Sequence, residues 1–94
     1  MQTSMIAYVI WYRDRQEYEA FRADADDPAN YHSTFEAWLK AAEQRSRELS
    51  SQGVILNKVY GTPADLRAWC TTQGIKVDAN GRQRYAVWKG RPRS

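Results

Sequence analysis

Hydrophobic and polar positions along the chain fall into two kinds of pattern. Residues 5–12 are apolar at every position and rich in β-branched and aromatic side chains, which predicts a strand covered on both faces. Residues 54–60 have a similar composition and predict a second strand. Elsewhere apolar residues recur at helical spacing, so the pattern predicts the order strand, helix, helix, strand, helix, helix.

Capping residues indicate where the predicted helices begin and end. Each of the first three helices starts at a side chain that can accept from free N–H groups and stops at a glycine or before a proline. The start and stop residues are Asp14 and Pro28, Ser33 and Gly53, and Thr62 and Gly74. The stretch 78–89 has two interpretations, because Asp78 can cap a helix whereas Asn80-Gly81 is a strong hairpin signal. The pattern favours the helix.

These elements predict a helix-rich α+β fold. Residues 1–88 are expected to form a single domain, and residues 89–94 a basic, flexible C-terminal tail. Two helices joined by a short connection reverse the chain twice, so we expect the two strands to be antiparallel. A two-stranded sheet has unpaired edges, and an exposed strand edge is open to pairing with a second copy. The sequence therefore predicts a possible homodimer.

Composition restricts the class of protein. One cysteine, Cys70, cannot form an internal disulfide, which favours a reducing compartment. The first apolar run has eight residues and no basic residue before it, unlike a secretory leader, and nothing approaches the length of a membrane span. We therefore expect a cytoplasmic protein with no membrane partner.

No catalytic or metal-binding motif is complete in this sequence. Three acidic residues, Asp24, Asp26 and Asp27, resemble the start of a calcium loop, but the later positions of that loop are wrong, and a solvated helix end is the preferred interpretation. Cys70 and His32 are isolated from each other, and Cys70 lies on an apolar helical stripe. We predict no catalytic residue, no metal site and no cofactor.

The positive charge is concentrated near the C-terminus. Residues 1–32 hold three basic and six acidic side chains, whereas residues 75–94 hold six basic and one acidic. This asymmetry indicates either an anion-binding tail or two parts of one domain that attract each other. The stretch Lys89-Gly90-Arg91-Pro92-Arg93 resembles the core of an AT-hook, an element that binds the minor groove of A/T-rich DNA. The candidate nucleic-acid-binding residues are Arg82, Arg84, Lys89, Arg91 and Arg93.

The helices also resemble those of a family of small bacterial proteins that has no assigned activity. The resemblance rests mainly on caps, stripe residues and turn glycines, so it supports the fold and implies no reaction. The matching features are Tyr18-Glu19-Ala20-Phe21-Arg22, Phe35-Glu36-Ala37-Trp38-Leu39, Gly53, Val59-Tyr60, Pro63, Leu66 with Trp69-Cys70 at the spacing Leu-x-x-Trp-Cys, Gly74, Asp78 and Arg84-Tyr85-Ala86.

Three functions remain open from the sequence. The first is a non-catalytic interaction or regulatory protein with a protein partner. The alternative is a nucleic-acid-binding accessory protein that uses the basic C-terminal end, and the third is a small enzyme without a recognisable motif.

Overall fold

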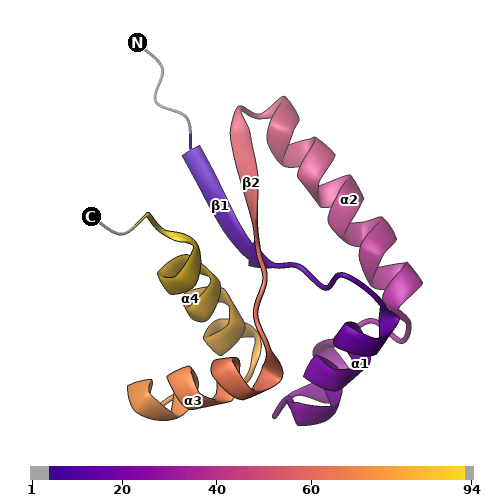
Figure 1. The fold of residues 1–94 in the computed structure, drawn as a ribbon. Coiled ribbons are helices and arrows are strands. Elements are labelled where there is room, and N and C mark those ends of the chain that lie inside the picture. Colours follow the sequence, from indigo (N-terminus) through magenta and orange to yellow (C-terminus); the bar gives the residue numbers. More distant parts are fainter. Residues whose placement is uncertain (1–4, 93–94) are drawn as a thin grey trace.

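The order of strands and helices agrees with the prediction. A computed structural model describes residues 5–92 of the 94-residue chain. The elements are β1 (Met5–Ile10), α1 (Arg15–Asp24), the short 3-10 helix η1 (Pro28–Asn30), α2 (Phe35–Ser51), β2 (Val54–Val59), α3 (Pro63–Gln73) and α4 (Ala79–Gly90). Figure 1 shows the two strands between α2 and α4, with α1 and α3 beyond the C-terminal ends of the strands.

The sheet is parallel, so the predicted antiparallel pairing is wrong. Met5 pairs with Val54 and Ile10 with Val59. The prediction failed because α1 does not run back along the sheet; it packs against α2 and α3 at the sheet end. Only α2 returns the chain, and its 17 residues span about 25 Å, enough to pass a six-residue strand of about 20 Å. The segment from β1 to β2 is therefore a crossover with α1 inserted.

Three of the four helices begin at the predicted cap. Asp14, Thr62 and Asp78 each accept a bond from the N–H three residues on. In α2 the cap is Thr34, one residue after the predicted Ser33, and its hydroxyl accepts from Ala37 N at 3.0 Å. Gly53 and Gly74 have the positive φ angles, 80° and 70°, that let a helix end in a left-handed residue.

The C-terminal stretch is a helix, as favoured, and it continues to Gly90. Lys89 and Gly90, which the sequence assigned to the tail, therefore belong to α4; Arg93 lies outside the described residues. A side chain at Gly90 would collide with Tyr8 and lie 2.8 Å from Val59 Cγ2. Close packing of the helix end on the sheet thus explains this glycine. The extended AT-hook conformation would require Lys89 and Gly90 to leave the helix.

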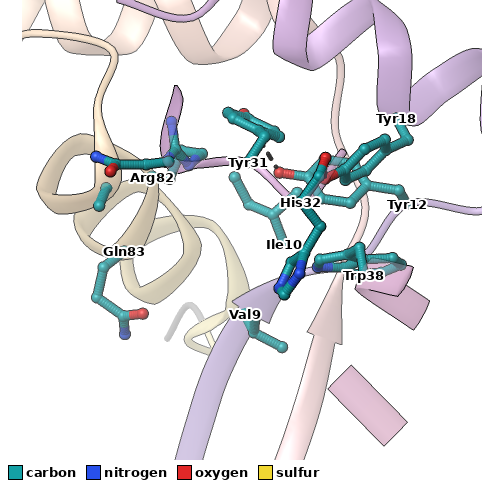
Figure 2. Close-up of a pocket in the computed structure, with 11 residues that line it drawn as sticks. Val9, Ile10, Tyr12, Tyr18, Tyr31, His32, Trp38, Arg82 and Gln83 are labelled. Atoms are coloured by element: carbon teal, nitrogen blue, oxygen red, sulfur yellow. Dashed lines mark hydrogen bonds between the residues drawn. The ribbon is translucent and has the colours of Figure 1, made fainter. Parts of the chain in front are cut away.

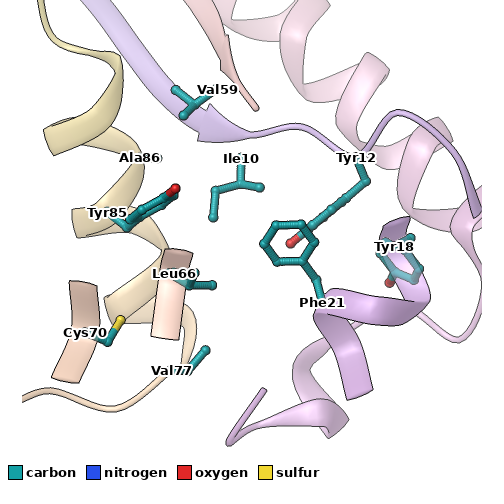
Figure 3. Packing of buried hydrophobic residues seen from close by; sticks show 10 residues of the cluster. All are labelled: Ile10, Tyr12, Tyr18, Phe21, Val59, Leu66, Cys70, Val77, Tyr85 and Ala86. Carbon is teal, nitrogen blue, oxygen red and sulfur yellow. The ribbon is translucent and has the colours of Figure 1, made fainter. Parts of the chain in front are cut away.

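The core lies where the helices meet the sheet, and its largest side chains are aromatic (Figure 3). Tyr18, Phe21 and Tyr85 are at most 1% exposed, and Tyr12 is also buried. Cys70 is fully buried, as the stripe on α3 predicted. Most of the aromatic content is therefore structural.

The three aspartates at the end of α1 are not simply a solvated helix end, which corrects that prediction. Asp24 and Asp26 pair with Arg67 of α3, and Asp27 pairs with Arg82 of α4. Asp26 also accepts from the Val77 N–H at 2.8 Å and donates its own N–H to the Val77 carbonyl, again at 2.8 Å. These bonds, here called the aspartate clamp, join the end of α1 to the two C-terminal helices.

No helix within residues 5–92 combines the length and the hydrophobicity needed to cross a membrane.

Replacing Tyr85 by Phe tests how much a buried hydroxyl without a hydrogen-bond partner destabilises the core. The Tyr85 hydroxyl is buried and has no hydrogen-bond partner among the described residues, whereas the Tyr18 hydroxyl donates to the His32 carbonyl at 2.7 Å. We expect Tyr85→Phe to leave the free energy of unfolding unchanged or raise it by up to about 1 kcal/mol, and Tyr18→Phe to lower it by about 1 kcal/mol. Urea denaturation measures both; a larger loss from Tyr85→Phe contradicts the assignment.

Candidate functional site

A pocket of about 260 Å³ lies beside the last residues of β1, where the strand has no neighbour (Figure 2). Val9 and Ile10 form its base. Side chains from α1, the loop after η1, α2 and the first turns of α4 close around it. The pocket is thus built from four segments within residues 9–38 and from the distant start of α4.

Aromatic rings form the inner wall of this pocket. Tyr12 packs edge-on against Trp38 and Tyr18, with ring centroids 4.7 and 5.2 Å away. The Tyr12 hydroxyl lies 3.5 Å from that of Tyr31, a long hydrogen bond that leaves each oxygen able to accept a second partner. The wall therefore offers apolar ring surface together with two hydroxyl groups.

Burial determines the protonation state of these hydroxyls. It raises the pKa of Tyr12 and of Tyr31 above the ordinary value of 10.0, and their mutual proximity raises the pKa of Tyr12 further. Both phenols are protonated at neutral pH. They can donate or accept hydrogen bonds to a ligand, but they are not phenolate nucleophiles.

Arg82 forms the polar side of the pocket, and its charge is already balanced. Its two terminal nitrogens bond the two carboxylate oxygens of Asp27 at 2.7 and 2.9 Å, and both side chains are 14% exposed. The guanidinium also lies over the Tyr31 ring, 4.4 Å from its centroid. Arg82 is therefore a wall residue paired with an acid, not a free cation for phosphate binding.

The open edge of β1 adjoins the pocket. Trp11 N donates to Val59 O at 2.9 Å, so odd-numbered residues of β1 face β2. The main-chain groups of Ile6, Tyr8 and Ile10 consequently point to the open edge. There the Gln83 side-chain amide donates to Tyr8 O at 3.3 Å. An exposed side chain thus occupies a position that the main chain of a neighbouring strand would take.

The other predicted nucleic-acid-binding residues lie elsewhere. Arg84 and Arg91 are exposed at helical spacing with Trp88, which is 46% exposed and whose ring centroid lies 5.7 Å from that of Trp69 on α3. Lys89 is exposed beside the Tyr85 ring. We call Arg84 and Trp88, together with Arg91 at the C-terminal cap of the helix, the basic face of α4. It is separate from the pocket, to which Arg82 and Gln83 contribute.

Sequence reasoning missed most of the pocket. Tyr31 and Gln83 have no motif around them, Trp38 was interpreted only as part of an apolar stripe, and Asp27, which holds Arg82, was interpreted as part of a solvated helix end. These residues meet at one pocket because the aspartate clamp holds α4 and because α2 runs along the sheet. The local sequence predicts neither the clamp nor the direction of α2.

The side chains that could hold a metal or act as a nucleophile are not gathered at the pocket in the described part of the chain. No group of three or more His, Cys, Asp or Glu side chains within residues 5–92 is arranged to hold a metal ion. Burial raises the pKa of Cys70, which keeps it a thiol. His32 lies at the exposed rim of the pocket, and Cys70 lies in the core on α3. The arrangement is suited to binding.

Comparisons with models of protein families, with curated proteins and with solved structures find no match to this chain. The resemblance to a family of small bacterial proteins therefore stays a prediction.

The Asp27–Arg82 pair should make the protein sensitive to acid. Bonds from Arg82 lower the pKa of Asp27 below its ordinary 3.8, and bonds from Val77 N and Arg67 lower that of Asp26. Because the folded protein holds these carboxylates ionised at a pH where the unfolded chain protonates them, their stabilisation is complete above about pH 5 and is lost as the pH falls through 4 and below.

We expect Asp27→Asn to lower the free energy of unfolding at pH 7 by about 2 to 4 kcal/mol, since it leaves the mostly buried Arg82 guanidinium without its charged partner. It should also flatten the loss of stability between about pH 5 and 3. Urea denaturation across this range measures both effects. Glu43→Gln, at an exposed α2 residue that makes no ion pair within residues 5–92, is the control. Equal acid sensitivity of both variants contradicts the role of the clamp.

Proposed function

We propose that this protein is a non-catalytic interaction module that binds an extended segment of a partner protein at the open edge of β1. The segment adds a strand beside Ile6, Tyr8 and Ile10, and one of its side chains enters the pocket. The contact from Gln83 to the Tyr8 carbonyl carries the proposal, because a main-chain amide can replace this exposed, 3.3 Å bond at little cost.

The pocket favours an uncharged aromatic side chain in that segment. Arg82 and Asp27 neutralise each other, so neither an acidic nor a basic group gains a free counter-charge. The rings of Tyr12, Tyr31 and Trp38 provide edge and face contacts for another ring. The Tyr12 and Tyr31 hydroxyls can bond a ligand hydroxyl, which favours tyrosine over phenylalanine.

A designed peptide tests both parts of the proposal. The probe is acetyl-Lys-Thr-Val-Tyr-Val-Thr-Lys-amide, and binding is followed by NMR shifts of the Gln83 side-chain amide and the Trp38 indole N–H. We expect saturable binding below about 1 mM, weakened about tenfold when the central tyrosine is replaced by alanine. We also expect Gln83→Ala to strengthen binding, because it frees the Tyr8 carbonyl, whereas Gln44→Ala on α2 should not.

N-methylation separates strand addition from simple insertion of a ring. In an added strand, alternate peptide amides face β1 and the others face solvent. Methylating one alternate set should abolish binding, and methylating the other set should leave it unchanged. Equal effects of the two sets, or no saturable binding at about 1 mM, would contradict the proposal.

Nucleic-acid binding through the basic face of α4 is the second candidate. Arg84 and Arg91 are exposed and make no ion pair within residues 5–92, and Trp88 between them presents part of its ring to solvent. Cations of this kind bind phosphates, and an aromatic ring can stack on an unpaired base. This face supports single-strand binding in addition to the minor-groove binding that the C-terminal motif predicts.

A salt titration distinguishes these possibilities. We expect the double variant Arg84→Gln/Arg91→Gln to bind a dT20 strand more weakly and to reduce the slope of log K against log salt by about 1 to 1.5. Arg47→Gln, an exposed residue of α2, is the control. Preference for an A/T-rich over a G/C-rich duplex would favour the minor-groove motif. Identical slopes for the wild type and the double variant would remove the basic face as a nucleic-acid site.

A further inference from the structure

We infer that a second copy of this chain pairs with the outer edge of β2 in an antiparallel register centred on Leu56. This surface is on the opposite side of the sheet from the β1 edge, and the inference does not depend on what binds there. The result is a two-fold symmetric dimer with a continuous four-stranded sheet.

The main chain of β2 defines the register. Since Val59 O accepts from Trp11 N, the odd-numbered residues of β2 face β1, and Val54, Leu56 and Lys58 face outward. Within residues 5–92 no side chain bonds to these outward N–H and C=O groups. In an antiparallel pair, outward-facing residues must oppose each other. A two-fold axis at Leu56 satisfies this, placing each Val54 opposite the other copy's Lys58.

Space is available along this edge. A recess of about 470 Å³ runs beside Val54, Ile55 and Leu56, and the α2 residues that line it, Ser46 and Ser50, are small. Lys58, a residue type that often protects exposed edges, folds back instead, with its ammonium nitrogen 4.2 Å from the Trp11 ring centroid. The α2 helix thus borders the edge without closing it.

The exposed apolar side chains near this edge favour a partner that is itself apolar there. Ile55 is 56% exposed and pairs in register with Ile6, which is 49% exposed. In the proposed register Ile55 of each copy lies beside Asn57 of the other and diagonal to the other Ile55. Two partly exposed rows thereby become one longer row, and no like charges face each other.

A second copy of the chain cannot pair with the open edge of β1 in the same way. There the central outward residue is Tyr8, and its carbonyl accepts from Gln83. The pocket walls, formed from α4 on one side and by His32 and Trp38 on the other, stand beside the strand (Figure 2). A single extended segment fits such an edge, whereas a whole folded copy with its own helices does not.

Cysteine cross-linking tests the register, because Cys70 is buried and leaves the background low. On the axis the two Leu56 Cα atoms are about 5.5 Å apart, within the roughly 4.4–6.8 Å that a disulfide spans. We expect Leu56→Cys to form a covalent dimer on mild oxidation. Lys58→Cys alone should not cross-link, but mixed with Val54→Cys it should. Failure of Leu56→Cys, or self-linking of Lys58→Cys, overturns the register.

Sedimentation equilibrium of the wild type and of two matched variants tests the dimer itself. We expect the wild type to dimerise below about 100 µM and Ile55→Glu to weaken association at least about tenfold. Met5→Glu changes an apolar residue of β1 that is even more exposed, at 68%, and should leave association unchanged. A wild type that stays monomeric at about 100 µM, or equal effects of both variants, overturns the inference. Circular dichroism confirms that both variants fold.

Discussion

The rest of the structure depends on the bonds that the aspartates after α1 make with the C-terminal helices. Asp27 and Arg82 form a mostly buried ion pair with two hydrogen bonds, and Asp26 bonds Val77 through both its main chain and its side chain. Charge-assisted bonds of this geometry are stronger than neutral ones and leave little freedom in the relative position of the two segments. They hold the start of α4 against the loop that carries Tyr31.

The position of α4 against the loop that carries Tyr31 affects the protein surface at both ends of the sheet. Along one side of the sheet, α4 and the loop before α2 form a walled pocket next to the open edge of β1. At the other end, α4 stops at Gly90, and Ile6 and Ile55 beyond it stay exposed. The molecule is flat, with extents of 42 × 33 × 18 Å. The two unpaired edges of its sheet differ in chemistry, because the pocket adjoins the β1 edge and exposed apolar side chains lie near the β2 edge. A sheet of two strands is marginal by itself, and its unpaired edges are open to further strands.

The clamp also explains part of the charge asymmetry along the chain. The acidic N-terminal third and the basic C-terminal end attract each other where Asp27 meets Arg82, while Arg67 from the middle of the chain joins Asp24 and Asp26. Of the two interpretations of that asymmetry, internal attraction accounts for Arg82. It does not account for Arg84 of α4 and Arg91 at the cap of that helix, which are both exposed to solvent. The internal pairing and the basic face are thus properties of different sides of one helix.

The sequence by itself determined the elements. Caps at Asp14, Thr62 and Asp78 and the left-handed glycines Gly53 and Gly74 act within a few residues, so local chemistry is sufficient to place them. The burial of Cys70 also followed from its helical stripe.

Only the tertiary structure decided the direction of β2, because it depends on whether α1 or α2 runs along the sheet, which packing settles. Tertiary packing also decided that Asp27 belongs to the aspartate clamp. It likewise brought Tyr12, Tyr31, Trp38 and Gln83 together around one pocket. Such contacts join residues up to 75 positions apart, as from Tyr8 to Gln83, and no local pattern encodes them.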